Sequence, residues 1–195
     1  MRYSKEHKAE TRDRIIETAA PLFRRFGFEG VSINKLMKAV NLTHGGFYAH
    51  FESKDALIEE LLTRDAGLVR MLSEREGATR ESLNADALRI LDDYLNAENL
   101  EQIIEGCPLA TMPIDASRST PRLQSAYGNR FQTLIKQLRR GLGTSRKDNE
   151  TAIAVAVLAV GGIVFARASA SNQEAVDVAQ ACSKQIARLL GEADG

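Results

Sequence analysis

Apolar residues recur at three- and four-residue intervals along most of the chain, which predicts a protein built from α-helices. The first such stripe runs from Ile15 to Phe26 and predicts a helix over residues 11–26, after a frayed polar start at residues 1–10. Gly27 is the residue expected to end this helix, with Phe28 placed to pack back against it. Because only four prolines interrupt the chain, the expected fold class is all-α.

The stretch from Ser32 to Phe51, SINKLMKAVNLTHGGFYAHF, predicts two short helices joined by a tight turn. Four apolar residues form the stripe of the first helix: Ile33, Leu36, Met37 and Val40. Ser32 is placed to cap that helix, Asn41 tolerates the positive φ of a turn, and Thr43 is placed to cap a second helix of about two turns. This is the geometry of a helix-turn-helix, whose second helix enters the major groove of DNA.

The pattern after Phe51 predicts further helices of different lengths. Ser53 caps a helix that could extend to Glu76, a rod of roughly 35 Å at the α-helical rise per residue. Helices are also expected over residues 80–97, with an apolar pattern continuing to Gly106, over residues 121–140, and over residues 172–190. At most a short helix is expected between Pro108 and Ser117, and Gly141 and Gly143 are expected to end the helix before them.

The segment Ala152–Ala168 is apolar on nearly every side, which predicts a buried helix. Its small residues, Gly161 and Gly162 among them, would let another backbone approach, either from a second copy or from the core of the same chain. The run Ala152–Ala166 is short for a membrane span, so no membrane partner is expected. No signal-peptide pattern begins the chain, and a cytoplasmic location is expected.

Residues Phe23–Leu57 resemble the DNA-binding head of the TetR family of transcriptional regulators, within a match covering residues 11 to about 62. The strongest part is Thr43–Phe51, THGGFYAHF, followed by Ser53-Lys54. The chain departs from the family pattern at Gly46, where Thr or Ser is frequent, so one hydroxyl contact to DNA is missing. Asn41 and Met37 also stand where Gly and Ala are commoner.

The resemblance implies a three-helix head at residues 1–52 and a ligand-binding and dimerisation body at residues 53–195. The last two helices of the body would pair with their copies in a four-helix dimer interface. The implied partners are double-stranded operator DNA with an inverted repeat, a second copy of the chain and a small-molecule effector of unknown identity. Eight residues are the DNA-binding candidates: Ser32, Thr43, His44, Gly45, Gly46, Tyr48, His50 and Lys54. Thr43, His44 and Gly46 are favoured for base readout, and Tyr48, His50 and Lys54 for phosphate contacts.

The zero net charge is divided unevenly along the chain. Residues 1–54 hold ten Lys and Arg against six Asp and Glu, a balance of +4, which leaves −4 for residues 55–195. The basic excess thus lies with the DNA-reading stretch, as phosphate neutralisation requires, although a balance of this size is also within ordinary scatter.

Enzyme chemistry has little support in the sequence, and no catalytic residue, cofactor or metal is expected. No Gly-rich phosphate loop, metal-ligand cluster or nucleophile elbow stands out. His44 and His50 are six residues apart with no third ligand nearby. The two cysteines, Cys107 and Cys182, do not form a disulfide framework.

Cys107 is a candidate sensing residue. The segment Glu105–Ala110, EGCPLA, resembles the Gly-Cys-Pro segment of one TetR branch in which some members respond to electrophiles or oxidants. Pro108 fits the first position of a helix, which would put Cys107 at the N-cap, where free N–H groups lower a thiol pKa. The alternative is a small buried residue that only packs.

The expected function is therefore a DNA-binding repressor that a small-molecule ligand or oxidant or electrophile stress releases from its operator. The alternatives are a transcriptional activator and a helical adaptor that binds protein instead of DNA. An adaptor would show no salt-dependent affinity for DNA.

Overall fold

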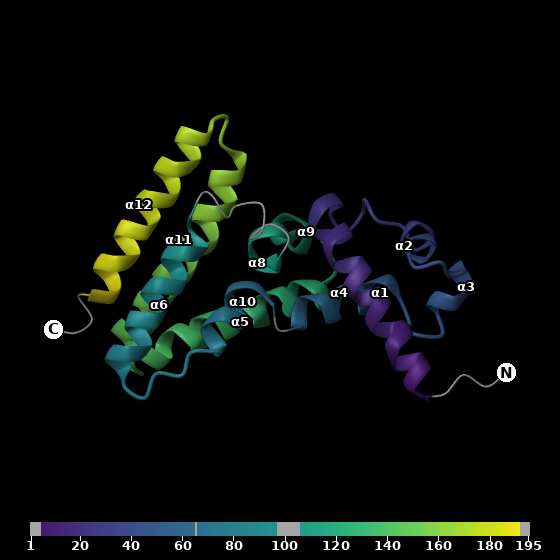
Figure 1. Cartoon of the computed structure of the whole chain (residues 1–195), viewed down its shortest axis with the longest axis horizontal. Helices are drawn as coiled ribbons and strands as arrows, with labels where there is room; N and C mark the ends of the chain where they lie inside the picture. Colours follow the sequence, from purple (N-terminus) through teal and green to yellow (C-terminus); the bar gives the residue numbers. More distant parts are fainter. Residues whose placement is uncertain (1–4, 65, 97–105, 192–195) are drawn as a thin grey trace. The chain divides into compact units, whose positions relative to one another are not determined.

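A computed structural model describes residues 5–64, 66–96 and 106–191, and every regular element in these ranges is a helix (Figure 1). The all-α prediction is confirmed. The chain divides into two compact units. Met1–Arg64 and Met112–Tyr127 form one, called the head unit here, and Asp65–Thr111 and Gly128–Gly195 form the other, called the body unit.

The head unit is larger than the head of residues 1–52 expected from the sequence. Its helices are α1 (Lys5–Phe26), α2 (Ile33–Ala39), α3 (His44–Phe47), α4 (Lys54–Thr63), α9 (Pro113–Ser117) and the beginning of α10 (Pro121–Leu142). Leu57 and Leu62 of α4 are buried in the same apolar core as Phe23 and Phe47. Met112 and Leu123 belong to that core too, so segments far apart in the sequence complete the head.

The first helix begins earlier than its apolar stripe predicts, at Lys5 instead of Thr11. The extra turns are polar and exposed, so hydrophobic periodicity could not reveal them. The predicted end of the helix is confirmed. Gly27 has a φ of +72°, its N–H donates to the Phe23 carbonyl at 2.9 Å, and Phe28 is buried against the Phe23 ring.

The expected single rod from Ser53 to Glu76 is wrong, because the chain breaks into α4 and α5 (Gly67–Ser73). Helix α4 ends at Thr63, where Arg64 turns to an extended conformation with a ψ of 143°. Gly67 then begins α5 with a φ of +56°, a conformation that side chains rarely adopt. A Cβ atom on Gly67 would lie 2.7 Å from the Cα atom of Cys107, so the glycine also permits a close backbone approach within the body unit.

The body unit contains α5, α6 (Arg80–Tyr94), α8 (Pro108–Thr111), the remainder of α10, α11 (Arg146–Ala168) and α12 (Asn172–Gly191). The expected continuation of the apolar pattern at Leu100, Ile103 and Ile104 lies outside the described residues. Gly141 was expected to help end the helix before it, but it lies inside α10. There a Cβ atom would fall 2.2 Å from the Asn84 Oδ1 atom, so Gly141 permits close packing while Gly143 follows the helix end.

Helices α11 and α12 run antiparallel side by side (Figure 1). By length and composition alone, α11 could cross a membrane. It is longer than the sequence suggested because Ser145 and Asp148 form a capping box that adds a polar first turn at Arg146. Eight of its residues are buried, as in the core helix of a folded domain. Gly162 is one of them, and a Cβ atom added to it would meet Leu95 and Cys182 of the same chain.

Candidate nucleic-acid interface

The turn between α2 and α3 forms as the sequence predicts. Ser32 Oγ accepts a hydrogen bond from the Lys35 N–H at 3.1 Å and caps α2. Among the non-glycine residues that the structure describes, Asn41 has a positive φ, at 56°. The N–H of Leu42 then donates to the Met37 carbonyl at 2.8 Å, which closes the turn. These local hydrogen bonds direct the chain from α2 into α3.

The second helix is shorter than the two turns expected, since α3 contains only His44–Phe47. Thr43 Oγ1 accepts a hydrogen bond from the Gly46 N–H at 3.2 Å, so the predicted cap is present. Gly45 and Gly46 are poor helix formers, which explains the short helix. The following residues continue as turns, with the His50 N–H donating to the Phe47 carbonyl at 2.9 Å.

The base-reading candidates lie together on the surface of the head unit. Thr43, His44 and Gly45 are exposed, and Gly46 is half-buried. A Cβ atom on Gly45 would meet no heavy atom within 4 Å, and one on Gly46 would make only ordinary contacts. Neither glycine is therefore required by packing within the chain, and their missing side chains leave room for the close approach of a groove edge.

The phosphate-contact candidates differ in exposure. Tyr48 is 54% exposed, with its ring edge-on to Phe47 at 5.4 Å and to His44 at 5.6 Å. The ring thus packs on the core while much of the side chain remains accessible. Lys54 begins α4 and is half-buried, with Nζ 6.0 Å from the centre of the Phe23 ring. Ser32 is exposed, although its hydroxyl already caps α2.

His50 is half-buried at the end of this turn. Its Nδ1 atom is buried and has no hydrogen-bond partner in the described part of the chain. Burial lowers the pKa of His50 below its usual 6.5, and the positive charges of Lys8 and Arg12 lower it further. The imidazole therefore sits in a basic environment that disfavours its own protonation, as expected near a surface that attracts phosphate.

Two exposed cations that the sequence pattern did not single out lie on α2, which packs against α3. They are Lys35 and Lys38. The Lys35 Nζ atom lies 3.9 Å from the centre of the exposed Phe26 ring. In the sequence, both lysines stand between apolar residues of the α2 stripe, and this placement indicates that their side chains face solvent.

Cys107 lies in the body unit, whereas the DNA-binding candidates lie in the head unit and are distant in sequence. It directly precedes Pro108, the first residue of α8, as the sequence predicted. The side chain is only 1% exposed, and the Tyr94 hydroxyl donates to its Sγ atom at 3.2 Å. Because α8 has a single turn, its N-terminal field is weaker than that of a long helix.

Comparisons with known proteins agree with this geometry. Residues 15–61 match the family model described as bacterial regulatory proteins, tetR family. Residues 15–61 therefore form a DNA-binding domain of the TetR type. It is 30% identical over 74 residues to the HTH-type transcriptional repressor Rv1474c of Mycobacterium tuberculosis, a match covering 38% of this chain and 40% of that protein. It is 23% identical over 151 residues to the HTH-type transcriptional repressor NemR of Escherichia coli, covering 75% and 74% of the two chains.

The likeness in fold extends beyond the matched head. The reduced form of E. coli NemR superimposes with a TM-score of 0.73 at 20% identity, covering 92% of this chain and 96% of that one. At this identity the likeness concerns the fold alone. The matched head and these relatives indicate that the chain is a DNA-binding transcriptional regulator.

Proposed function

We propose that this protein is a cytoplasmic, homodimeric repressor that binds an inverted-repeat operator and leaves it when the body unit receives a signal. The capped α3, which presents Thr43, His44, Gly45 and Tyr48 together at the surface, is the observation that carries the proposal. The similar proteins Rv1474c and NemR are named as repressors, which favours repression over activation. A protein-binding adaptor would have no need for the surrounding cations Lys35 and Lys38.

A second copy of the chain is the partner that the body unit fits best. Helix α11 exposes Ile153, Val157 and Phe165, which stand at spacings of four or eight residues and therefore share one face. Phe165 is 68% exposed in the single chain. Covering this face by the same helices of a second copy would remove an apolar patch from water and place two copies of α3 on one duplex.

Two kinds of signal can act on the body unit. A small molecule would favour the dimer state whose recognition helices no longer match the operator spacing. A cavity of about 320 Å³ between α6 and α12, lined in part by Asp92, Asn96 and Gln180, is one place for such a ligand. An oxidant or electrophile is the second candidate, favoured by the Cys107 thiol and its Tyr94 hydrogen bond.

Selection of bound fragments from a random duplex library tests the proposed function. The full-length protein is expected to enrich duplexes with an inverted repeat whose half-sites lie about one helical turn apart. Its affinity for them should fall steeply with salt and should exceed its affinity for shuffled duplex. If the protein enriched no sequence in this selection, the proposal of an operator-binding regulator would be refuted.

A further inference from the structure

The recognition segment, residues 43–51, cannot hold its own shape by helix propensity. Two of the four residues of α3 are glycines, which are among the weakest helix formers. Thr43 fixes the N-terminal end through its cap. At the C-terminal end, the N–H groups of His50 and Phe51 donate to the Phe47 carbonyl, and contacts from elsewhere in the head unit add to these backbone hydrogen bonds.

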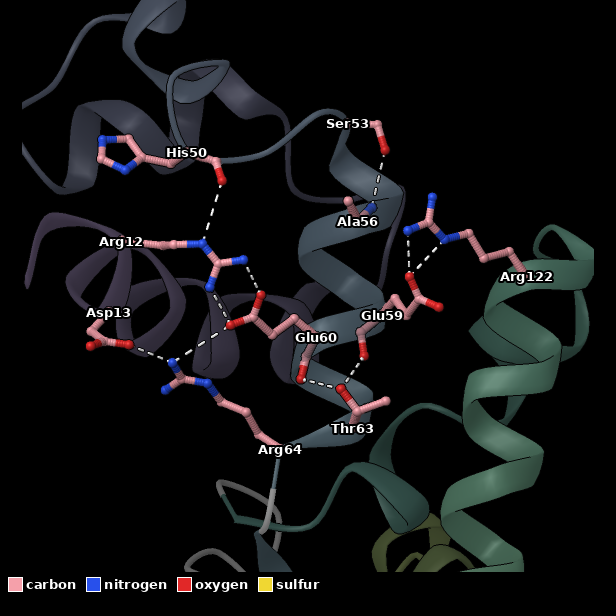
Figure 2. A network of polar contacts seen from close by, with 10 residues as sticks. All are labelled: Arg12, Asp13, His50, Ser53, Ala56, Glu59, Glu60, Thr63, Arg64 and Arg122. Carbon is pink, nitrogen blue, oxygen red and sulfur yellow. Dashed lines mark hydrogen bonds and ion pairs between the residues drawn. The ribbon is translucent and has the colours of Figure 1, made fainter. Parts of the chain in front are cut away.

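Arg12 of α1 supplies those contacts (Figure 2). Its Nε atom donates to the His50 carbonyl at 3.4 Å, and its guanidinium carbon lies 4.5 Å from the centre of the Phe51 ring. The other two nitrogens bind the two carboxylate oxygens of Glu60 on α4, one of them at 2.5 Å. One guanidinium thus ties together α1, α4 and the end of the recognition segment.

The Phe51 ring connects Arg12 with the exposed residues of the recognition segment through aromatic contacts. It stacks on Phe47 with a centroid distance of 5.4 Å and an interplanar angle of 29°. Phe47 is fully buried and in turn meets the Tyr48 ring, which meets His44. An unbroken series of contacts therefore joins Arg12 to both an expected phosphate contact and an expected base contact.

Glu60 is held in place from its other side. Arg64 lies 3.8 Å from its Oε1 atom and binds Asp13 at 2.6 Å (Figure 2). The carboxylate that orients Arg12 is thus fixed by a second arginine, whose ion pairs join α1 and α4. Each of the three guanidinium nitrogens of Arg12 donates one hydrogen bond within the head unit, although the side chain is 38% exposed.

We propose that Arg12 is a positioning residue for DNA recognition, which fixes the C-terminal end of the recognition segment from behind without contacting DNA. The inference rests on the proposed function. A fixed segment matters for reading bases, because each base contact needs a defined geometry, and matters little for the electrostatic attraction to phosphate. Loss of Arg12 should therefore lower specific affinity and leave non-specific affinity unchanged.

The test compares full-length wild type, Arg12→Lys and the control Arg146→Lys, an arginine that forms an ion pair with Glu150 in the body unit. Lysine keeps the charge but lacks the planar fork that binds Glu60 and His50 together. Each protein is titrated across a salt series with the inverted-repeat duplex that wild type selects from a random library, and with a shuffled duplex. Arg12→Lys is expected to lose roughly tenfold or more on the selected duplex only. Arg146→Lys should bind both duplexes as wild type does.

Several outcomes would overturn the proposal. Equal losses on both duplexes would make Arg12 a direct phosphate contact, because phosphate contacts do not depend on the sequence. Wild-type binding by Arg12→Lys, or losses equal to those of Arg146→Lys, would make it an ordinary structural ion pair. If Arg12→Lys is unfolded by circular dichroism, Glu60→Gln replaces it, with a smaller loss expected on the selected duplex alone. Failure of wild type to prefer any duplex would instead refute the proposed function.

Discussion

The carboxylate of Asp115 accepts a hydrogen bond from the backbone N–H of Phe28 at 2.9 Å, although 87 positions separate the two residues. Asp115 belongs to α9, and Phe28 follows the glycine that ends α1. A Cβ atom on Gly27 would lie 2.6 Å from the same carboxylate oxygen. The end of α1 is therefore shaped to admit the Asp115 side chain, and this contact attaches α9 to the rest of the head unit.

Replacing Asp115 by alanine should destabilise the head unit by about 1–2 kcal/mol, because a partly buried N–H loses its charged acceptor. Asp115→Asn keeps an acceptor oxygen and should cost less. Urea unfolding followed by circular dichroism measures both free energies. Equal stability of wild type and Asp115→Ala would show that water replaces the carboxylate without loss.

Lys54→Gln and Tyr48→Phe should both weaken binding to selected and shuffled duplexes, but for different reasons. Loss of the Lys54 charge removes one counterion-releasing contact and should lower the salt slope by about 0.9. Tyr48→Phe removes a neutral hydroxyl and should leave the slope unchanged. Fluorescence anisotropy across a salt series separates the two. An unaltered slope for Lys54→Gln would mean that its side chain stays over Phe23 in the complex.

His44→Ala should change which bases are preferred, at about 1–3 kcal/mol for the position that His44 reads. The exposed side chain stands in the first turn of α3, from which a recognition helix contacts base edges. Repeating the duplex selection with the variant gives the measurement. Thr43→Ser is the control for the cap, since it keeps the oxygen that accepts from Gly46. If the variant selects the wild-type sequence, base readout by His44 is refuted.

Phe165→Asp should convert the dimer to a monomer by placing a charge in the apolar face of α11. Monomeric protein should also bind the selected duplex more weakly, because one recognition helix then acts alone. Sedimentation velocity reports the assembly state. Ile114→Asp is a matched control, since Ile114 is 61% exposed but lies on α9. A dimeric Phe165→Asp protein would place the interface elsewhere.

Peroxide or a quinone should release wild type and Cys182→Ser from the selected duplex, but not Cys107→Ser. Because the Cys107 side chain is 1% exposed, the reaction should require local opening and should be slower than that of a thiol in unfolded protein. Gel shifts with timed oxidant exposure follow the release. Equal release of all three proteins, or of none, would refute Cys107 sensing and leave a small-molecule effector as the signal.

The sequence by itself determined those features that depend on hydrogen bonds and contacts within one or two helical turns. The caps at Ser32 and Thr43, the positive φ of Asn41 and the glycine end of α1 all belong to this class. Each is decided by the conformational preference of one residue and by an acceptor three or four positions away. The family resemblance rests on the same local features, so both the helix-turn-helix and its exposed residues could be found without a structure.

Only the tertiary structure decided features that depend on segments distant in the sequence. The close approach of Gly67 to Cys107 and the burial of Cys107 beside Tyr94 both depend on how distant segments of the body unit pack. Arg12 and Glu60, 48 positions apart, leave no periodic pattern because each is one charged residue on a polar helix face. Such pairs form only when the apolar core brings α1 and α4 together, so no local preference predicts them.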